Sequence, residues 1–325
     1  MGRLTPAVLF TCAGQRVDIV KAFARAGAKT VAIDLNPLAP ALYHADHRVL
    51  APPIGAPEYL PRLIEIVTEF GIGLIVPLTD LDMTLLAEQR EELGAVLLLP
   101  ELEVVERAND KYSTHLFFEE HGIGSPSAWL PRKLQDELPF PVLVKPRRGF
   151  GSRNIFLARD RRELDFYLAR TPVPSFVQAM CAGEEFSIDV LCDLDGRCLN
   201  AIPRTMIESK GGESIKGMTV RDEELIELGR HVSETIGVKG PATIQCFRTE
   251  PGRNEITDVN LRFGGAFPLP LAAGGDFPSL ALALARGERP GTRLGDFRDA
   301  VFMTRFFSEV CLVEAEDGTL VPFGG

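Results

Sequence analysis

The feature that most constrains the fold is the regular alternation of short apolar segments and amphipathic segments at the start of the chain. The apolar runs Ala7–Cys12 and Thr30–Asp34 have the length and composition of buried parallel strands. Between them, Val17, Val20 and Ala24 recur on one helical face, and a glycine follows. Repeated strand–helix units of this kind predict a parallel, doubly wound sheet covered by helices.

The same alternation continues to about residue 100. Strands are predicted at Gly73–Leu78 and Ala95–Leu99, and helices at Leu60–Phe70 and Leu81–Leu93, each helix followed by a glycine. We therefore predict a Rossmann-like N-terminal domain over residues 1–108.

The pattern changes after this domain, and a chain of 325 residues is long enough for a second one. A helix at Tyr112–Glu120 is followed by several predicted strands, of which Phe186–Cys192 and Arg197–Ile202 flank a hairpin-like turn. The glycine-rich stretch Thr205–Thr219 has the composition of a mobile loop. We predict an α+β domain over residues 109–290 with a lid subdomain at about 109–180, and a C-terminal extension, 291–325, packed on it.

Charge and cysteine content exclude several classes of protein. Lys and Arg number 35 and Asp and Glu 45, so the net charge of −10 gives no basic surface for nucleic acid or anionic membrane. The apolar runs are shorter than a membrane helix requires. The six cysteines stand singly, which disfavours a structural zinc site and fits a reducing compartment. We expect a cytoplasmic protein without nucleic-acid or membrane partners, and a homodimer is one option for its assembly.

The first turn resembles a dinucleotide-binding fingerprint only in part. Gly14 follows the first strand, and Asp34 ends the second one at the spacing of a ribose-binding carboxylate. A complete fingerprint needs three glycines with separate steric roles, and this turn has one. The pattern favours a Rossmann-like scaffold without a dinucleotide and disfavours an NAD-dependent oxidoreductase.

A phosphate-binding pattern lies in the second domain. Lys145 ends a predicted strand, and the glycine-rich turn Gly149–Ser152 follows it. Backbone N–H groups of such a turn can approach phosphates while the ammonium group neutralises their charge. In protein kinases the glycine-rich loop precedes the lysine, so this order disfavours a kinase fold.

A metal-binding pattern follows further along the chain. Asp258 and Asn260 are two residues apart on a predicted strand and therefore face the same way. Gln245 joins them if it lies on an adjacent antiparallel strand, and Mg²⁺ prefers oxygen ligands of this kind. Arg262 shares that face and could hold a phosphoryl group during transfer. The alternative is an ordinary solvated strand.

In this order, the elements between Asn109 and Leu284 resemble those of the ATP-grasp superfamily, and the first domain resembles the pre-ATP-grasp domain that accompanies it. Within the superfamily the chain is most similar to carbamoyl-phosphate-synthetase-like ligases with a single unit. A complete carbamoyl phosphate synthetase pairs two units, so the chain is not expected to be one.

The resemblance implies ATP and Mg²⁺ as cofactors, with Mn²⁺ as a substitute, and gives the candidate residues their roles. Lys111 and Lys145 are expected to bind the phosphates of ATP, and Gly149, Gly151 and Ser152 to form a lid over them. Lys216 and Arg262 are expected to act at the γ-phosphate as catalytic residues. The residues expected to contact adenine and ribose are Gln178, Met180, Cys181 and Glu185. The residues expected to bind the metal are Gln245, Asp258 and Asn260.

Two positions depart from the family pattern. The adenine strand has Gln178-Ala179-Met180 where the family often has glutamate, and Asp258 stands where it usually has a longer glutamate. Both keep the required charge or contacts, so an active enzyme is expected.

The resemblance implies an ADP-forming ligase that joins a small-molecule carboxylate to an amine through an acyl phosphate. A kinase or carboxylase with the same fold, or a nucleotide-binding module without chemistry, remains an alternative. The substrates are undefined: arginines suit a carboxylate and aspartates an ammonium group, and the candidates are Arg204, Glu208, Lys210, Glu213, Arg262, Asp80 and Asp82. For the two aspartates, capping of the following helix is an equally good explanation.

Overall fold

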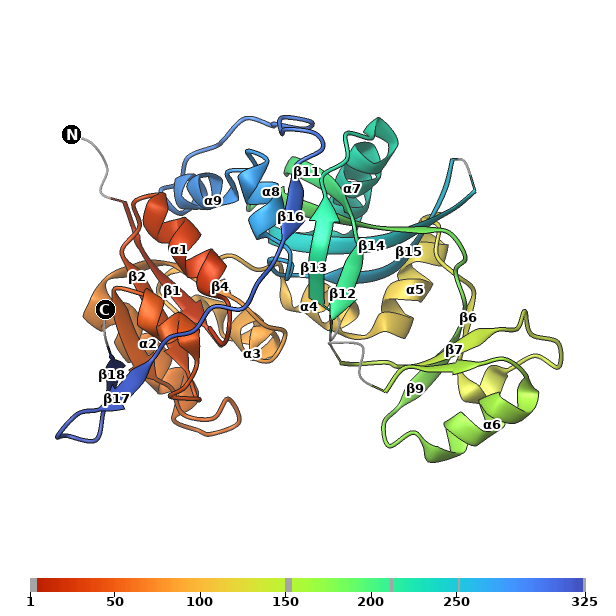
Figure 1. Cartoon of the computed structure of the whole chain (residues 1–325), viewed down its shortest axis with the longest axis horizontal. Helices are drawn as coiled ribbons and strands as arrows, with labels where there is room; N and C mark the ends of the chain where they lie inside the picture. Colours follow the sequence, from red (N-terminus) through yellow and green to blue (C-terminus); the bar gives the residue numbers. More distant parts are fainter. Residues whose placement is uncertain (1–4, 150–153, 211–212, 251, 324–325) are drawn as a thin grey trace.

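The computed structural model describes residues 5–149, 154–210, 213–250 and 252–323, so the predicted lid residues Gly151 and Ser152 lie outside the described part. Three of the five sheets in the described part of the chain follow one another along the longest axis of the molecule (Figure 1). The N-terminal sheet lies at one end, a small sheet carrying α6 at the other, and a four-stranded sheet between them.

The N-terminal sheet confirms the predicted α/β architecture. Its five strands are parallel in the order β3-β2-β1-β4-β5. The strands are β1 (Ala7–Thr11), β2 (Thr30–Asp34), β3 (His47–Leu50), β4 (Ile72–Pro77) and β5 (Val96–Leu97). The helices and turns are α1 (Val17–Arg25), η1 (Pro40–His44), α2 (Tyr59–Phe70), α3 (Met83–Glu88), η2 (Arg90–Glu92) and α4 (Leu102–Asn109).

The predicted helix Leu81–Leu93 is wrong in length, because the structure divides it into α3 and the short turn η2. Arg90 begins that turn, and its guanidinium donates hydrogen bonds to the backbone carbonyls of Leu97, Leu99 and Pro100. This contact ties the chain to the end of β5.

The sheet in the middle of the molecule is antiparallel in the order β11-β10-β14-β15, and the name four-stranded sheet is kept for it. Its strands are β10 (Glu184–Cys192), β11 (Cys198–Thr205), β14 (Gly240–Glu250) and β15 (Arg253–Asn260). Helix α7 (Glu223–Ile236) covers one face, and it lies so close that a Cβ on Gly229 would be 2.6 Å from Cγ2 of Ile188. The opposite face remains available for a site.

The small sheet, which we call the lid sheet, has the order β6-β9-β7-β8. It comprises β6 (Ala128–Trp129), β7 (Val142–Pro146), β8 (Phe156–Ala158) and β9 (Ser175–Ala179), with η3 (Pro131–Lys133) and α6 (Arg161–Arg170). It has a hydrophobic core of its own, formed by Val142, Val144, Ala158, Leu164 and Val177. Helix α5 (Lys111–Glu120) precedes it.

The predicted loop Thr205–Thr219 is wrong, because this stretch contains the hairpin strands β12 (Glu208–Lys210) and β13 (Glu213–Met218). β13 also pairs with β16 (Phe302–Thr304). A Cβ on Gly217 would lie 2.7 Å from the carbonyl oxygen of Thr205, so this glycine permits close packing of strands.

The rest of the chain leads from the middle of the molecule back to the N-terminal sheet (Figure 1). α8 (Pro268–Ala272) and α9 (Phe277–Ala285) lead to β16, and β17 (Leu312–Glu314) and β18 (Leu320–Pro322) form a final hairpin. Arg48 donates to the carbonyl of Leu320 at 3.0 Å, so the end of the extension lies beside the N-terminal sheet, whereas β16 pairs within the second domain.

One large hydrophobic core runs from the N-terminal sheet into the four-stranded sheet. At the junction, the rings of Phe23 and Phe263 lie 6.0 Å apart, and those of Phe263 and Phe267 lie 4.6 Å apart. None of the helices in the described part of the chain has the length and apolarity that crossing a bilayer requires.

Candidate active site

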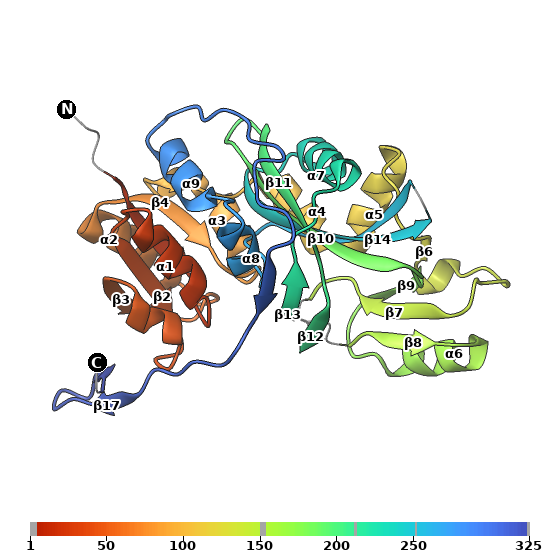
Figure 2. The same cartoon turned by 45° about the horizontal axis from the view of Figure 1, so that its top comes forward.

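A cavity of about 670 Å³, which we call the cleft, opens among the N-terminal domain, the lid sheet and the four-stranded sheet. Figure 2 shows β10 and β14 between the N-terminal helices and the lid strands β7 and β9. Most of the candidate residues line the cleft: Lys111, Lys145, Gly149, Gln178, Met180, Cys181, Glu185, Gln245, Asp258, Asn260 and Arg262.

The register of the four-stranded sheet places polar residues in rows across its open face. Gln245 of β14 lies directly opposite Asp258 of β15, and Thr243 lies opposite Asn260. On the other side of β14, Ser187 of β10 lies opposite Gln245. Because side chains alternate along a strand, these residues all face the cleft.

At the β15 end, the predicted metal ligands and phosphate-binding residues contact one another. The ammonium group of Lys111 forms an ion pair with Asp258, and Arg262 donates from Nη2 to Oδ1 of Asn260 at 3.3 Å. Arg262 also lies 3.5 Å from Asp80 of the N-terminal domain. Burial works to raise the pKa of Asp258, but the ammonium groups of Lys111 and Lys145 outweigh it and hold the pKa below its ordinary value.

Lys145 occupies the lid side of the cleft. It is buried, and its Nζ donates to Oε1 of Gln178 at 2.9 Å, which gives the side chain of Gln178 a partner within the lid sheet. Burial lowers the pKa of Lys145, and the nearby charge of Asp258 opposes that shift. The ammonium group is therefore held in a site where a phosphate would replace lost hydration.

The first turn of α5 positions Lys111. Asp110 accepts hydrogen bonds from the backbone N–H groups of Tyr112 and Ser113 and caps the helix. Its carboxylate also pairs with Arg147, whose carbonyl accepts the N–H of Lys111 at 2.8 Å. This network joins α5 to the glycine-rich turn that follows β7.

The residues predicted to hold adenine and ribose lie together at the lid end of β10. Cys181 donates from Sγ to Glu255 at 3.2 Å, and burial raises the pKa of this thiol to about 12. Burial also raises the pKa of Glu185, which Arg204 and Lys145 partly offset. Met180 is about half exposed and lines the cleft.

Lys216 lies apart from the other candidates. It is on β13, forms an ion pair with Glu208, and both side chains are half exposed. It is not among the described residues that line the cleft.

Arg16 is a cleft residue that the sequence analysis missed. It follows β1, and it donates to the carbonyls of Phe263 and Gly264 at 3.1 and 2.7 Å, which ties the N-terminal turn to the loop after β15. Its position in the sequence could have identified it, because polar residues that follow a parallel strand lie at the edge of the sheet where ligands bind. Asp34 accepts the N–H of Gly14 at 2.7 Å and the N–H of Asn36 at 2.8 Å, so its carboxylate stabilises this turn.

Asp82 does not cap α3 with its side chain, so the capping explanation is wrong for this residue. The carboxyl group is fully buried and accepts a hydrogen bond from the hydroxyl of Tyr59 at 2.8 Å. Burial raises its pKa. Burial, together with the charge of Asp82, also raises the pKa of Cys12 to about 12, so the Cys12 thiol at the wall of the cleft stays neutral.

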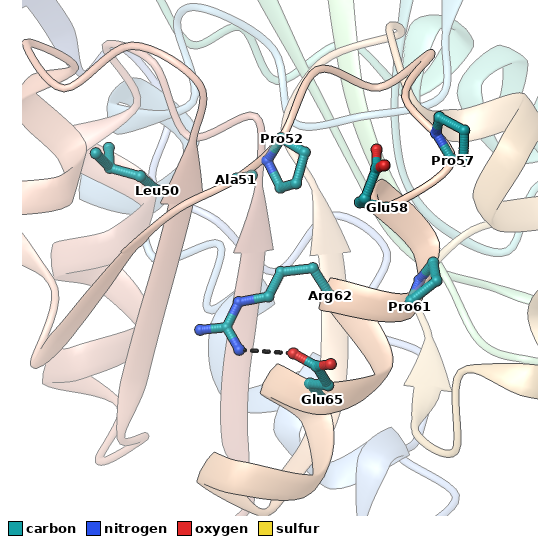
Figure 3. A pocket seen from close by; sticks show the side chains of 8 residues that line it. All are labelled: Leu50, Ala51, Pro52, Pro57, Glu58, Pro61, Arg62 and Glu65. Carbon is teal, nitrogen blue, oxygen red and sulfur yellow. Dashed lines mark hydrogen bonds and ion pairs between the residues drawn. The ribbon is translucent and has the colours of Figure 1, made fainter.

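A second hollow of about 540 Å³ lies on the N-terminal domain, between the end of β3 and the start of α2 (Figure 3). Three prolines line it, and its one arginine, Arg62, pairs with Glu65 at 2.9 Å. Two of its three charged side chains, Arg62 and Glu65, thus pair with each other, and it shares no described lining residue with the cleft.

The candidate metal ligands suit a magnesium site in which a bound phosphate compound supplies part of the coordination. In the described part of the chain, no group of three or more histidine, cysteine, aspartate or glutamate side chains could hold a metal. Gln245, Asp258 and Asn260 offer oxygen atoms but a single carboxylate. This set suits Mg²⁺ when phosphate oxygens supply the remaining ligands.

Comparison with known protein families finds two matches that cover different parts of the chain. Residues 8–98 match the family described as "PylC-like, N-terminal domain". Residues 172–303 match the family described as "ATP-grasp in the biosynthetic pathway with Ter operon".

A carbamoyl phosphate synthase large chain from Clostridium beijerinckii is 24% identical over 272 residues, which are 78% of this chain and 25% of that protein. The chain thus spans about a quarter of the length of this relative. The biotin carboxylase domain of 2-oxoglutarate carboxylase from Hydrogenobacter thermophilus has a TM-score of 0.75 at 18% identity, covering 92% of this chain and 74% of that one. An L-amino acid ligase from Bacillus licheniformis has a TM-score of 0.70 at 19% identity, with coverages of 93% and 79%.

These matches confirm the predicted fold and the resemblance. The chain has an ATP-grasp fold that follows a Rossmann-like N-terminal domain. In sequence it is similar to carbamoyl phosphate synthase large chains and to an ATP-grasp family.

Proposed function

We propose that this protein is an ATP-dependent ligase that joins a carboxylate to an amine and releases ADP and phosphate. The observation that carries the proposal is the convergence of Lys111, Lys145 and Arg262 on the Asp258–Asn260 end of the cleft. The structurally similar biotin carboxylase domain was crystallised with MgADP and bicarbonate, which supports nucleotide binding by this fold.

Lys111 and Lys145 would neutralise the α- and β-phosphates of ATP, and Met180, Cys181 and Glu185 would contact adenine and ribose. Gln245, Asp258 and Asn260 would hold Mg²⁺, or Mn²⁺ in its place. When bound, the metal supplies charge neutralisation at the transferring phosphoryl group. Lys111 would then exchange its contact with Asp258 for a phosphate oxygen.

The reaction begins when an oxygen of the substrate carboxylate attacks the γ-phosphorus, and the bond from that phosphorus to the β–γ bridging oxygen breaks. ADP leaves, and an acyl phosphate remains. The amine nitrogen then attacks the acyl carbon and loses a proton, and inorganic phosphate leaves. Arg262, beside Asn260, is placed to stabilise the charge that moves during transfer. The mechanism needs no nucleophilic side chain, in keeping with the neutral thiol of Cys12.

The products test this proposal. Carboxylate labelled with oxygen-18 should pass its label to inorganic phosphate, with ADP as the nucleotide product. Asp258→Asn and Lys145→Met should each reduce turnover at least about 100-fold, because each removes charge stabilisation from the reacting end. Lys239→Met is the control, since Lys239 pairs with Glu101 outside the lining of the cleft. Label in AMP would contradict the acyl-phosphate mechanism.

A carboxylase is the second candidate, favoured by the bicarbonate in the crystal structure of the biotin carboxylase domain. The same assay decides between the two. ADP release that requires bicarbonate and is independent of an organic carboxylate would favour the carboxylase.

A further inference from the structure

Arg204 is a buried cation in the cleft, and the proposed binding of ATP gives it no role. It lies on β11, its side chain is 4% exposed, and it lines the cleft. Nε donates to Oδ2 of Asp189 at 2.7 Å, whereas Nη1 has no hydrogen-bond partner among the described residues. A buried guanidinium N–H without an acceptor is unfavourable, so this open edge suggests the place of a ligand.

The contacts behind Arg204 hold it in this orientation. Asp189 receives Arg204 on one oxygen and the hydroxyl of Thr243, at 2.8 Å, on the other. The backbone of Gly264 packs directly on this group: a Cβ there would lie 2.6 Å from Oγ1 of Thr243 and 2.7 Å from Oδ1 of Asp189. One edge of the guanidinium is thus fixed, and the other edge is left for an acceptor in the cleft.

The position of Arg204 separates it from the phosphates. Arg204 bonds Asp189 on β10, and Asn260 lies two strands further along the sheet, on β15. Two strand spacings correspond to about 10 Å. Hydrogen bonds of about 3 Å at each end would leave about 4 Å between the two bound carboxylate oxygens.

The charge at this position favours a carboxylate. Asp189 compensates the charge of Arg204, so the pair attracts an anion through directed hydrogen bonds more than through net charge. A polyphosphate would be better served by the other end of the cleft, where Lys111 and Lys145 share the single carboxylate of Asp258.

We propose that Arg204 binds a second carboxylate of the substrate, so that the acid activated by ATP is a short dicarboxylic acid. Its reacting carboxylate lies beside Arg262 and Asn260, and its other carboxylate accepts a hydrogen bond from Nη1 of Arg204. Acids with four or five carbons in the chain can span this separation of about 4 Å between oxygens. This assignment rests on the proposed ligase function and names its substrate class.

The experiment compares acids that differ only in the second carboxylate. Succinate, glutarate, aspartate and glutamate are matched with butyrate, pentanoate, 2-aminobutyrate and norvaline, in which a methyl group replaces that carboxylate. Binding to the MgADP-loaded enzyme is measured by calorimetry, and ADP release from ATP is measured separately. At least one dicarboxylate should bind about 10- to 100-fold more tightly than its partner. Arg204→Met should remove this preference, and Arg204→Lys should restore part of it.

Arg197→Met is the matched control. Arg197 lies at the other end of the same β10–β11 hairpin and donates from Nε to Asp193 at 3.0 Å, but it is 47% exposed and does not line the cleft. The preference should survive this change. Arg204→Met leaves the buried carboxylate of Asp189 without its ion-pair partner. The double variant Asp189→Asn/Arg204→Met removes that charge as well and allows the test if Arg204→Met alone does not fold.

The outcomes separate the two proposals. Equal binding of dicarboxylates and their partners, no binding of any dicarboxylate, or an unchanged preference in both Arg204→Met and the double variant would overturn the assignment. Phosphate release with a monocarboxylate would leave the ligase function intact in each of these cases. Conversely, dicarboxylate binding that depends on Arg204, without any ADP release, would support the role of Arg204 and count against the ligase function.

Discussion

The two sheets that face each other across the cleft are stabilised in different ways. The four-stranded sheet belongs to the large core that continues into the N-terminal domain, and Phe263 lies in that core at the junction. The lid sheet has a separate, much smaller core around Val142 and Val177. A large shared core fixes the first sheet, whereas the second can unfold or shift with little effect on the rest.

The candidate residues divide between these two sheets. Gln245, Asp258 and Asn260 belong to the four-stranded sheet, and Lys145 and Gln178 belong to the lid sheet. The metal candidates therefore lie on the sheet that the large core fixes, and the lid residues lie on the sheet with the separate, smaller core. The following predictions test this contrast.

The largest effect is expected for Phe263→Ala. Phe263 is 1% exposed and contacts the rings of Phe23 and Phe267, so its loss leaves a cavity in the shared core. Unfolding free energy should fall by about 3–5 kcal/mol. Urea unfolding should show the N-terminal domain and the four-stranded sheet losing stability together. A loss confined to one of them would contradict a shared core.

Leu164→Ala should have a smaller and local effect. Leu164 is fully buried under the lid sheet, and the cost should be about 2–4 kcal/mol. Hydrogen exchange should become faster in peptides within residues 128–179 and stay unchanged in β1 and β4. Bound MgATP should restore part of the protection. Faster exchange throughout the molecule would show that the two cores are coupled.

Local sequence patterns predicted the elements but not all of their partners. The apolar runs of β1 and β2 and the glycine after α2 identify a parallel α/β domain. The two-residue spacing of Asp258 and Asn260 predicted a common face, and the structure pairs that strand with Gln245 as expected. These features depend on periodicity within one segment, which a sequence displays directly.

The parts that could not be predicted depend on contacts between distant segments. The glycines of the Thr205–Thr219 stretch suggested a loop, but Gly217 serves close packing of strands. The open edge of Arg204 follows from the pairing of β10 with β11, which orients Asp189 toward it. A buried Asp82 bonded to Tyr59 is likewise a tertiary contact, for which the local sequence offers a helix cap as the nearest explanation.

Asp110→Ala should have an intermediate effect, because Asp110 joins the two regions. It caps α5 and pairs with Arg147 of the lid, and loss of both contacts should cost about 2 kcal/mol at pH 7. Asp110→Asn keeps a capping oxygen and loses the charge, so it should cost about half as much. Chemical unfolding of the three proteins measures the difference. Equal losses in both variants would assign the whole effect to the ion pair.

The same variants predict a dependence on pH. Burial works to raise the pKa of Asp110, but hydrogen bonds from Arg147 and the N–H of Ser113 outweigh it, and the pKa lies below its ordinary value. A lowered pKa in the folded state gives stability that is complete above the unfolded-state pKa and is lost as pH falls through the folded-state pKa. The gap between wild type and Asp110→Ala should therefore shrink below about pH 4. A gap that stays constant at acid pH would contradict the assigned ionisation.

The smallest effect on stability is expected for Lys216→Met. Lys216 and Glu208 form a half-exposed ion pair on the β12–β13 hairpin, and such pairs contribute about 0.5 kcal/mol or less. Removal of the pair should leave unfolding almost unchanged. If this hairpin delivers Lys216 to the γ-phosphate during transfer, kcat should fall about 10-fold or more while binding of ATP changes little. Glu208→Gln is the matched control: it also breaks the pair but leaves the ammonium group free, so it should lose no turnover. Equal turnover in Lys216→Met and wild type would restrict charge stabilisation at the γ-phosphate to Arg262 and the proposed metal site. The ligands proposed for that site lie on the four-stranded sheet, and Arg262 lies on the loop that follows it.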